Sequence, residues 1–254
     1  LFWPALLKNS SYKQPDVIHV HGFITINGEK MSKSKGTFIT ADNFADECDP
    51  ELLRYYYASK LNSKIEDIDL NFDDLAKKIN SDLVGKFSNI FSRSAPFIAK
   101  NIIRLPSKFA FEHVASSLKN TKEILLMFET KEFSKATKLI MEMADDTNRY
   151  INEKTPWKLD AKEAAVVATT AINVFKNLCI LLSPITPNLC AKMLAMLNIH
   201  EINLQEIETS LIDIEIKEFE AVISRVKPID VKNFNNEDEP MSNDDYFINI
   251  DDFM

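Results

Sequence analysis

The chain of 254 residues contains only four glycines, and three of them, Gly22, Gly28 and Gly36, lie close together near the N-terminus. Glycine is the residue that adopts left-handed or strained backbone conformations most readily, so backbone freedom is concentrated in this one segment. The length allows one or two domains with adequate cores. With 45% hydrophobic residues and so little glycine, we expect a globular and largely helical chain.

The glycines flank the sequence Lys30-Met31-Ser32-Lys33-Ser34-Lys35-Gly36, which places three ammonium groups and two hydroxyls in one short loop. Ammonium groups form strong charge-assisted hydrogen bonds to phosphate oxygens. A movable loop of this kind suits a polyphosphate, where losing one such contact typically costs about 3–4 kcal/mol of transition-state stabilisation. The alternatives are an exposed basic turn and a phosphorylated serine patch. The two serines are expected to shape the loop, because no paired His or carboxylate marks either as a nucleophile.

The sequence around this loop predicts regular structure on both sides. Residues 17–28 read as two short β-rich runs that pivot near His21-Gly22, with Asn27-Gly28 as a turn. Downstream, Asp49-Pro50 predicts a helix start, with a capping residue followed by a first-turn proline.

From Asn71 onward the pattern becomes helical. Apolar residues recur at steps of three and four, which is typical of the buried face of a long helix: Phe72, Leu75, Ile79, Leu83, Phe87 and Ile90. Further helical patterns cover about 113–129, 131–152, 161–183 and 187–197, with a plausible break at Asn120. Short connections between amphipathic helices predict an antiparallel bundle. The most apolar window, Ala164–Pro184, contains Thr, Asn and Lys residues and therefore predicts a buried helix, not a membrane span.

The charge and the cysteine and histidine content of the chain exclude few classes of function. The net charge is −8, but residues 229–254 contribute −7 of it, so the rest of the chain is close to neutral. Charge alone therefore neither supports nor excludes a nucleic-acid partner. Three scattered cysteines indicate reduced thiols, and the four histidines show no metal-ligand pattern.

Two polar features stand out in the helical region. A second stripe on the helix from Asn71 carries Asp82, Lys86, Asn89 and Arg93, which on spacing alone is a solvated face. In Thr155-Pro156-Trp157 we expect Thr155 to be an N-cap and Pro156 a first-turn residue, which places Trp157 in the first turn of a helix. There the indole can either stack on an unpaired base or belong to the core.

The Lys30–Ser34 motif resembles the loop that closes over ATP in class I aminoacyl-tRNA synthetases. The preceding residues 21–29 look specifically like the methionyl-tRNA synthetase family. Residues 82–93 resemble the anticodon-binding helix of that family, and residues 148–151 resemble the end of the helix that leads to its Pro-Trp pair.

The resemblance implies a function for each motif. Lys30 and Lys33 would act in catalysis, and Lys30, Met31, Ser32, Lys33 and Ser34 would bind ATP with Mg²⁺. The anticodon of tRNA(Met) would be bound by Asn89, Arg93, Pro156 and Trp157. Trp3, in a segment that matches a late part of the family's nucleotide-binding fold, falls near the methionine pocket, with a buried core position as the alternative. The family is cytoplasmic, and no membrane partner is implied.

The implied fold is mostly α: the C-terminal end of a class I Rossmann-like catalytic domain, followed by an antiparallel helical anticodon-binding bundle. Residues 1–70 would belong to the catalytic domain and residues 71–231 to the bundle. Residues 232–254 would form an acidic linker and the start of a further domain, of OB-fold type. Such a domain dimerises many bacterial members, so the resemblance allows a homodimer formed through it.

The family's His-Ile-Gly-His motif and its Cys-rich zinc knuckle are absent from these 254 residues. We therefore expect the chain to be the C-terminal half of a longer protein, inactive on its own, and any zinc to lie outside it. Two alternatives remain open. One is another class I synthetase of the leucyl, isoleucyl or valyl type, and the other is a non-catalytic tRNA-binding helical module.

Overall fold

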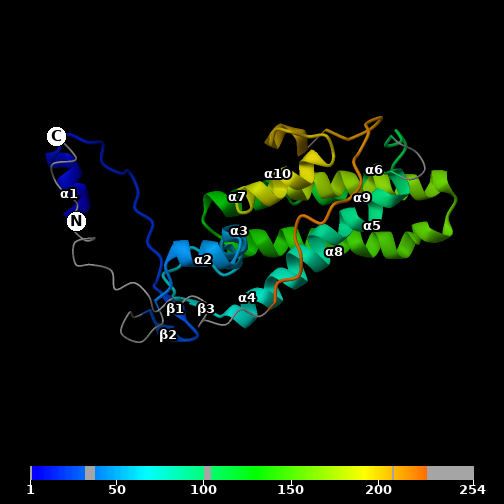
Figure 1. Cartoon of the computed structure of the whole chain (residues 1–254). Helices are drawn as coiled ribbons and strands as arrows, with labels where there is room; N and C mark the ends of the chain where they lie inside the picture. The colour runs from blue at the N-terminus through cyan, green and yellow to red at the C-terminus, as the bar shows by residue number, and fades with distance from the viewer. Residues whose placement is uncertain (1, 32–37, 100–103, 208, 228–254) are drawn as a thin grey trace.

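The structure, a computed structural model, describes residues 2–31, 38–99, 104–207 and 209–227. Figure 1 shows an elongated bundle of helices with a small sheet at one end and helix α1 set apart beyond the sheet. The elements are α1 (Phe2–Asn9), β1 (Ile24–Ile26), β2 (Glu29–Lys30), α2 (Ala41–Glu47), α3 (Pro50–Ala58), β3 (Ile68–Leu70), α4 (Phe72–Ile79), the π-helix η2 (Asn80–Ser88), α5 (Asn89–Ala99), α6 (Phe111–Leu118), α7 (Thr121–Glu129), α8 (Phe133–Lys154), the 3₁₀ turn η3 (Pro156–Lys158), α9 (Ala161–Leu182), α10 (Pro187–Ala195) and the 3₁₀ turn η4 (Leu204–Ile207).

The sheet has the strand order β2-β1-β3, with β1 antiparallel to β2 and parallel to β3. Asn27 and Gly28 form the predicted turn between β1 and β2, with φ values of 50° and 79°. The predicted strand in residues 17–20 is wrong, because these residues adopt neither strand nor helix. Val17, Ile18 and Val20 are each more than 60% exposed, so no described segment packs against them as a strand partner would.

The helix that begins after Asn71 is continuous through α4, η2 and α5. Its first turn is capped by Asn71, whose side chain accepts the Asp74 amide at 2.9 Å. The six apolar positions predicted from the sequence are all buried, none more than 2% exposed. The helix widens to π geometry over residues 80–88, which the periodicity of three and four did not indicate.

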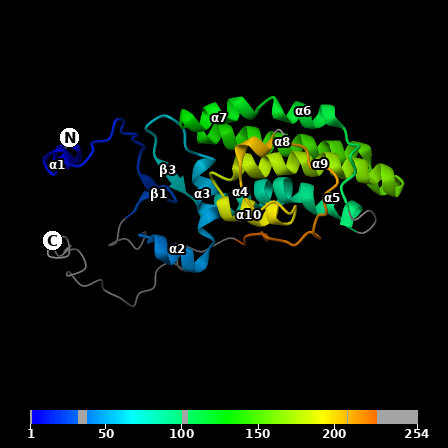
Figure 2. The same cartoon turned by 90° about the horizontal axis from the view of Figure 1, so that it is seen from above.

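Helix α9 is the centre of the bundle. It packs against α5 on one side and α8 on the other, and also contacts α6 and α10 (Figure 2). α9 is long and apolar enough to cross a membrane, but 94% of its most apolar window is buried within the protein. The prediction of a buried helix over Ala164–Pro184 is therefore confirmed. The predicted helix over 113–129 is divided into α6 and α7 at Lys119-Asn120.

Candidate loop hairpin and nucleic-acid-binding face

The β1–β2 hairpin leads directly into the lysine-rich loop. Lys30 ends β2 and is exposed, while Met31 is half-buried and packs against the core. Ser32, Lys33 and Ser34 lie outside the described residues. On the other side of the loop, Ile39 is only 8% exposed. Both ends of the loop are therefore held against packed structure.

A second polar array lies on the bundle, where α8 runs beside η2 and α5. Asn89 Nδ2 donates to Asn148 Oδ1 at 3.1 Å, and Arg93 Nη2 donates to Asn152 Oδ1 at 2.5 Å. Asn148 also donates to the main-chain carbonyl of Lys86 at 2.9 Å. We call these residues, with Trp157, the polar face.

Lys86 adds an ion pair to this array. Its Nζ lies 2.6 Å from Asp145 Oδ2 and 3.9 Å from Asp82 Oδ1. The hydrogen bond to Asp145 is the main reason that the pKa of Lys86 is raised above its ordinary value. In the Lys86–Asp145, Asn89–Asn148 and Arg93–Asn152 pairs the partners are 59 residues apart in every case, so η2–α5 and α8 run in the same direction and in register.

Trp157 lies at the end of the polar face. Its side chain is 53% exposed, so the alternative of a core tryptophan is excluded. Arg93 Cζ lies 5.8 Å from the centroid of the Trp157 ring, within the range of a cation–π contact. Partial burial lowers the pKa of Arg93 from its ordinary value. Pro156, the preceding residue, is buried.

The prediction for Thr155 is wrong. Thr155 has left-handed backbone angles, φ 44° and ψ 57°, and its side chain makes no capping hydrogen bond. Its amide instead bonds to the Ile151 carbonyl at 3.1 Å and ends α8. Trp157 therefore sits in the 3₁₀ turn η3, and the following helix is capped separately by Asp160, which accepts the Glu163 amide at 2.8 Å. The left-handed residue reverses the chain and leaves the indole at the surface.

Sequence reasoning missed three partners on α8: Asp145, Asn148 and Asn152. The sequence does contain a signal for them: Asp145, Asn148 and Asn152 have the same spacing of three and four residues as Lys86, Asn89 and Arg93. It also missed the stacking of His113 on Tyr150, whose ring centroids are 4.3 Å apart at an interplanar angle of 21°. Nothing in a single sequence brings α6 and α8 together.

Trp3 lies on α1, away from both the hairpin and the polar face (Figure 1). Its side chain is 72% exposed and α1 buries none of its residues, so the described part of the chain does not enclose this indole. In the described part of the chain, no group of three or more His, Cys, Asp or Glu side chains could hold a metal ion.

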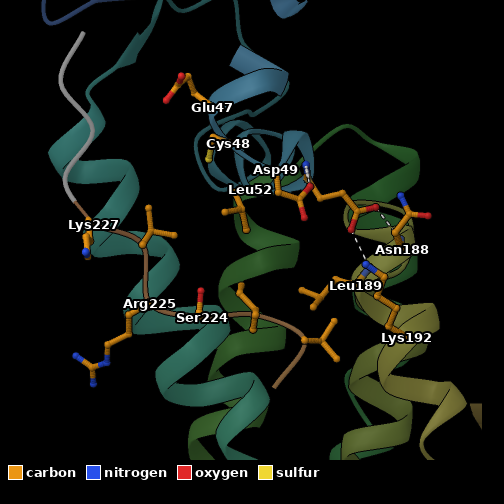
Figure 3. Close-up of a pocket in the computed structure, with 14 residues that line it drawn as sticks. Glu47, Cys48, Asp49, Leu52, Asn188, Leu189, Lys192, Ser224, Arg225 and Lys227 are labelled. Carbon is orange, nitrogen blue, oxygen red and sulfur yellow. Dashed lines mark hydrogen bonds between the residues drawn. The ribbon is translucent and has the colours of Figure 1, made fainter. Parts of the chain in front are cut away.

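A cavity of about 500 Å³ lies between α3, α10 and the segment 222–227 (Figure 3). Buried Glu51 borders it and accepts the amides of Asn188 and Leu189 at 2.7 and 2.8 Å. Asn80 holds the segment in place by bonds of 2.8 Å to both main-chain groups of Val226. Because Glu51 already satisfies the first amides of α10, they are not available to a ligand in this cavity.

Comparison with known proteins matches both parts of the chain. The family model described as tRNA synthetases class I (M) matches residues 1–95, and the anticodon-binding domain of tRNA ligase matches residues 113–233. The methionine–tRNA ligase of Psychrobacter arcticus is 43% identical over 238 residues, which is 91% of this chain and 34% of that protein. The corresponding protein of Psychrobacter sp. (strain PRwf-1) is 44% identical over 234 residues, 89% of this chain and 34% of its own length.

Among solved structures, Mycobacterium tuberculosis methionyl-tRNA synthetase in complex with methionyl-adenylate is similar with a TM-score of 0.74, at 23% identity. The match covers 85% of this chain and 45% of that one. The free form of the same enzyme has a TM-score of 0.75 at 20% identity, covering 90% of this chain and 47% of that one. These two structures support the fold. The chain spans about a third of the length of the curated relatives it matches. With both family models matched in the expected order, the chain belongs to the methionyl-tRNA synthetase family of class I aminoacyl-tRNA synthetases.

Proposed function

We propose that this chain is part of a methionine–tRNA ligase, which activates methionine with ATP and transfers it to tRNA(Met). In this proposal the chain supplies the lysine-rich loop and the anticodon-binding surface. The observation that carries it is the match to methionine–tRNA ligases over 91% of the chain, at 43% identity, with the loop and the polar face both included. This match favours a methionine–tRNA ligase over the leucyl, isoleucyl and valyl alternatives.

The proposed chemistry of activation is an in-line attack by the methionine carboxylate on the α-phosphate of ATP, which forms methionyl-adenylate as the bond to the β-phosphate oxygen breaks and pyrophosphate leaves. Negative charge builds on the phosphate oxygens, and Mg²⁺ bound with ATP would help to neutralise it. Lys30 and Lys33 would stabilise the same charge as the loop closes, with Met31, Ser32 and Ser34 forming the rest of the loop. Support comes from the hairpin, which ends at the exposed Lys30, and from the packing of Met31 and Ile39 against the core on either side of the loop.

The proposed anticodon site is the polar face. Arg93 can donate to O2 and N3 of a cytosine, and the Asn89 amide offers both a donor and an acceptor. The exposed indole of Trp157, which follows buried Pro156 in the chain, presents a flat surface on which an unpaired base can stack. This assignment is supported by the bonds to Asn148 and Asn152, because they hold Asn89 and Arg93 in fixed orientations.

The remaining parts of the proposal follow from the family. Residues 1–70 would complete the catalytic domain, residues 71–231 would form the anticodon-binding bundle, and residues 232–254 would lead to a further domain that could dimerise. Trp3 would line the methionine pocket. The ligase would work in the cytoplasm, and any zinc would be bound outside this chain.

The proposal can be tested with the complete ligase and its Lys33→Ala variant. We expect methionine-dependent exchange of pyrophosphate into ATP in the parent protein, and a rate about 100- to 1000-fold lower in Lys33→Ala, as for loss of one transition-state contact. Lys122→Ala, on the exposed surface of α7, is the matched control and should keep the parent rate. Charging of a tRNA with the anticodon CAU, but not of one with an altered anticodon, tests the second half of the proposal. Near-normal exchange in Lys33→Ala would refute the role of the loop.

A further inference from the structure

The hairpin that carries the lysine-rich loop has little backbone pairing of its own. β2 contains two residues, and its register with β1 consists of the pairs Thr25↔Lys30 and Ile26↔Glu29. Short strands of this kind are marginal without further contacts. The position of Lys30, where the loop begins, therefore depends on what holds β1 and the turn.

Asp69, in the middle of β3, lies next to this hairpin. It pairs with Thr25, which in turn pairs with Lys30, so the three residues form one row across the sheet. Its neighbours Ile68 and Leu70 are buried, and side chains alternate along a strand, so Asp69 faces the opposite side of the sheet. The carboxylate is therefore on the face that carries Thr25 and Lys30.

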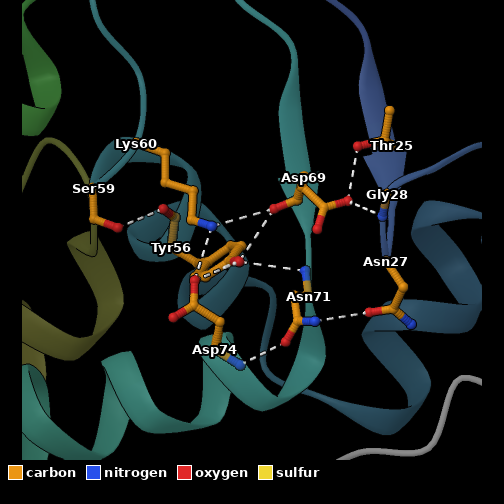
Figure 4. A network of polar contacts seen from close by, with 9 residues as sticks. All are labelled: Thr25, Asn27, Gly28, Tyr56, Ser59, Lys60, Asp69, Asn71 and Asp74. Atoms are coloured by element: carbon orange, nitrogen blue, oxygen red, sulfur yellow. Dashed lines mark hydrogen bonds and ion pairs between the residues drawn. The ribbon is translucent and has the colours of Figure 1, made fainter.

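One carboxylate oxygen of Asp69 binds the hairpin at two points (Figure 4). Asp69 Oδ1 accepts the hydroxyl of Thr25 at 2.8 Å and the main-chain amide of Gly28 at 2.7 Å. Gly28 has φ of 79° and lies two residues before Lys30. Hydrogen bonds to an ionised acceptor are roughly twice as strong as neutral ones. Asp69 thus fixes the turn itself as well as the strand that precedes it.

The other turn residue is held by the same stretch of chain. The Asn27 amide donates to the Leu70 carbonyl at 3.2 Å, and Asn71 Nδ2 donates to Asn27 Oδ1 at 3.1 Å. Both residues of the turn are consequently tied to residues 69–71, and the Asp69 carboxylate supplies the shortest of these bonds.

Residues 69–71 are in turn fixed to the helices. The hydroxyl of Tyr56, a fully buried residue of α3, accepts the Asn71 amide at 3.3 Å. It lies 3.2 Å from the Asp69 carbonyl and 3.0 Å from Asp74 Oδ2, and its one proton can be donated to either. Lys60 Nζ lies 3.4 Å from the Asp69 carbonyl and 2.9 Å from Asp74 Oδ2. The main chain of Asp69 is therefore attached to the α3–α4 corner, and its side chain to the hairpin (Figure 4).

We propose that Asp69 is a positioning residue for the lysine-rich loop: its carboxylate fixes the Asn27-Gly28 turn so that Lys30 and the residues after it start from one defined place. This inference rests on the proposed function, because it assigns how the ATP-contacting loop is held. Asp69 does not touch the substrate. It acts through the turn, and misplacing a reacting group by about 1 Å can lower a rate by about 100-fold.

The test compares Asp69→Ala with Asp69→Asn in the complete ligase. Alanine removes the acceptor, whereas the amide oxygen of asparagine can accept the same two hydrogen bonds. In pyrophosphate exchange we expect kcat/KM for ATP to fall about 10- to 100-fold in Asp69→Ala and to stay within about threefold of the parent in Asp69→Asn. The Kd for tRNA should be unchanged in both. Hydrogen exchange of the Gly28 amide should speed up in Asp69→Ala only.

Thr25 provides a second, independent comparison if Asp69→Ala does not fold. Thr25→Val keeps the shape of the side chain and removes one of the two donors to Asp69, and Thr25→Ser restores that donor. We expect Thr25→Val to lower kcat/KM for ATP by about three- to tenfold and Thr25→Ser to recover it, with the thermal midpoint of both close to the parent.

The outcomes separate this inference from the proposed function. A parent protein with no methionine-dependent exchange would refute the function, and with it the role given to Asp69. A parent protein that is active, with Asp69→Ala at the parent rate or with Asp69→Asn as slow as Asp69→Ala, would overturn the positioning role alone. Equal rates for Thr25→Val and Thr25→Ser would overturn it in the same way.

Discussion

The guanidinium group of Arg93 lies over the indole of Trp157, with Cζ 5.8 Å from the ring centroid, while its Nη2 donates to Asn152. One cation therefore connects the helix η2–α5, the helix α8 and the 3₁₀ turn after it. Because Arg93 is held from two sides, the proposed binding of a base by this guanidinium group would cost little conformational freedom.

Trp157→Ala should weaken tRNA binding in the complete ligase without slowing adenylate formation. Stacking of one base on an aromatic ring contributes about 1–3 kcal/mol, so the Kd for tRNA(Met) should rise about 5- to 150-fold. Filter binding of tRNA and methionine-dependent pyrophosphate exchange measure the two effects. Leu159→Ala, which truncates a partly exposed side chain two residues after Trp157, is the control. Equal losses in both reactions would indicate that Trp157 is structural.

Glu51→Ala should destabilise the junction between α3 and α10. The Glu51 carboxylate accepts the Asn188 and Leu189 amides at the start of α10, and its removal leaves both without that acceptor in a buried place. We expect the free energy of unfolding to fall by about 2–4 kcal/mol. Urea unfolding followed by circular dichroism measures it. Glu47→Ala, which removes an exposed carboxylate from the same cavity, should change it by less than about 0.5 kcal/mol. A similar loss in both variants would contradict the capping role.

The local part of this structure could be read from the sequence. Helical periodicity located the core face of α4–η2–α5, and Asp49-Pro50 marked the start of α3, where Asp49 accepts the Glu51 amide at 2.9 Å. Asn27-Gly28 marked the hairpin turn, because left-handed angles at two successive positions suit few other residue pairs. Each of these signals lies within a few residues of the feature it predicts.

The rest depends on contacts between distant parts of the chain. Glu51 accepts the amide of Asn188 in α10, 137 residues later, and Asn89 contacts an asparagine 59 residues away. No local pattern specifies such pairs. The prediction for Thr155 is also wrong for this reason. Threonine is a residue type that suits an N-cap, but here Thr155 ends α8 with left-handed backbone angles. The site residues inferred from the family, Lys33 above all, stay predictions until the experiments above are done.

Gly22→Ala should disturb the attachment of β1 to β3. A Cβ at this position would lie 2.4 Å from the main-chain carbonyl of Glu66, so the two segments would have to move apart. The adjacent bond between the Phe23 amide and Asp67 Oδ1, 2.8 Å long, would be lost. We expect Gly22→Ala to speed hydrogen exchange of the amides in β1. Gly28→Ala is the control, because a Cβ there meets nothing within 4 Å and only the positive φ is strained, at about 1–2 kcal/mol. A larger effect at Gly28 would contradict the close approach.

The burial of His113, whose ring stacks on Tyr150, should make stability depend on pH near neutrality. Burial lowers the pKa of His113 from its usual 6.5, although Asp146 and Glu153 oppose the shift. The unfolded chain then takes up a proton more readily than the folded one, so stability is lost as pH falls through 6.5 towards the folded pKa. His113→Phe keeps a stacked ring without a titrating group. Between about pH 7.5 and about pH 5.5, its thermal midpoint should therefore fall less than that of the parent. Parallel pH profiles for the two proteins would show that His113 takes up its proton equally well in the folded state.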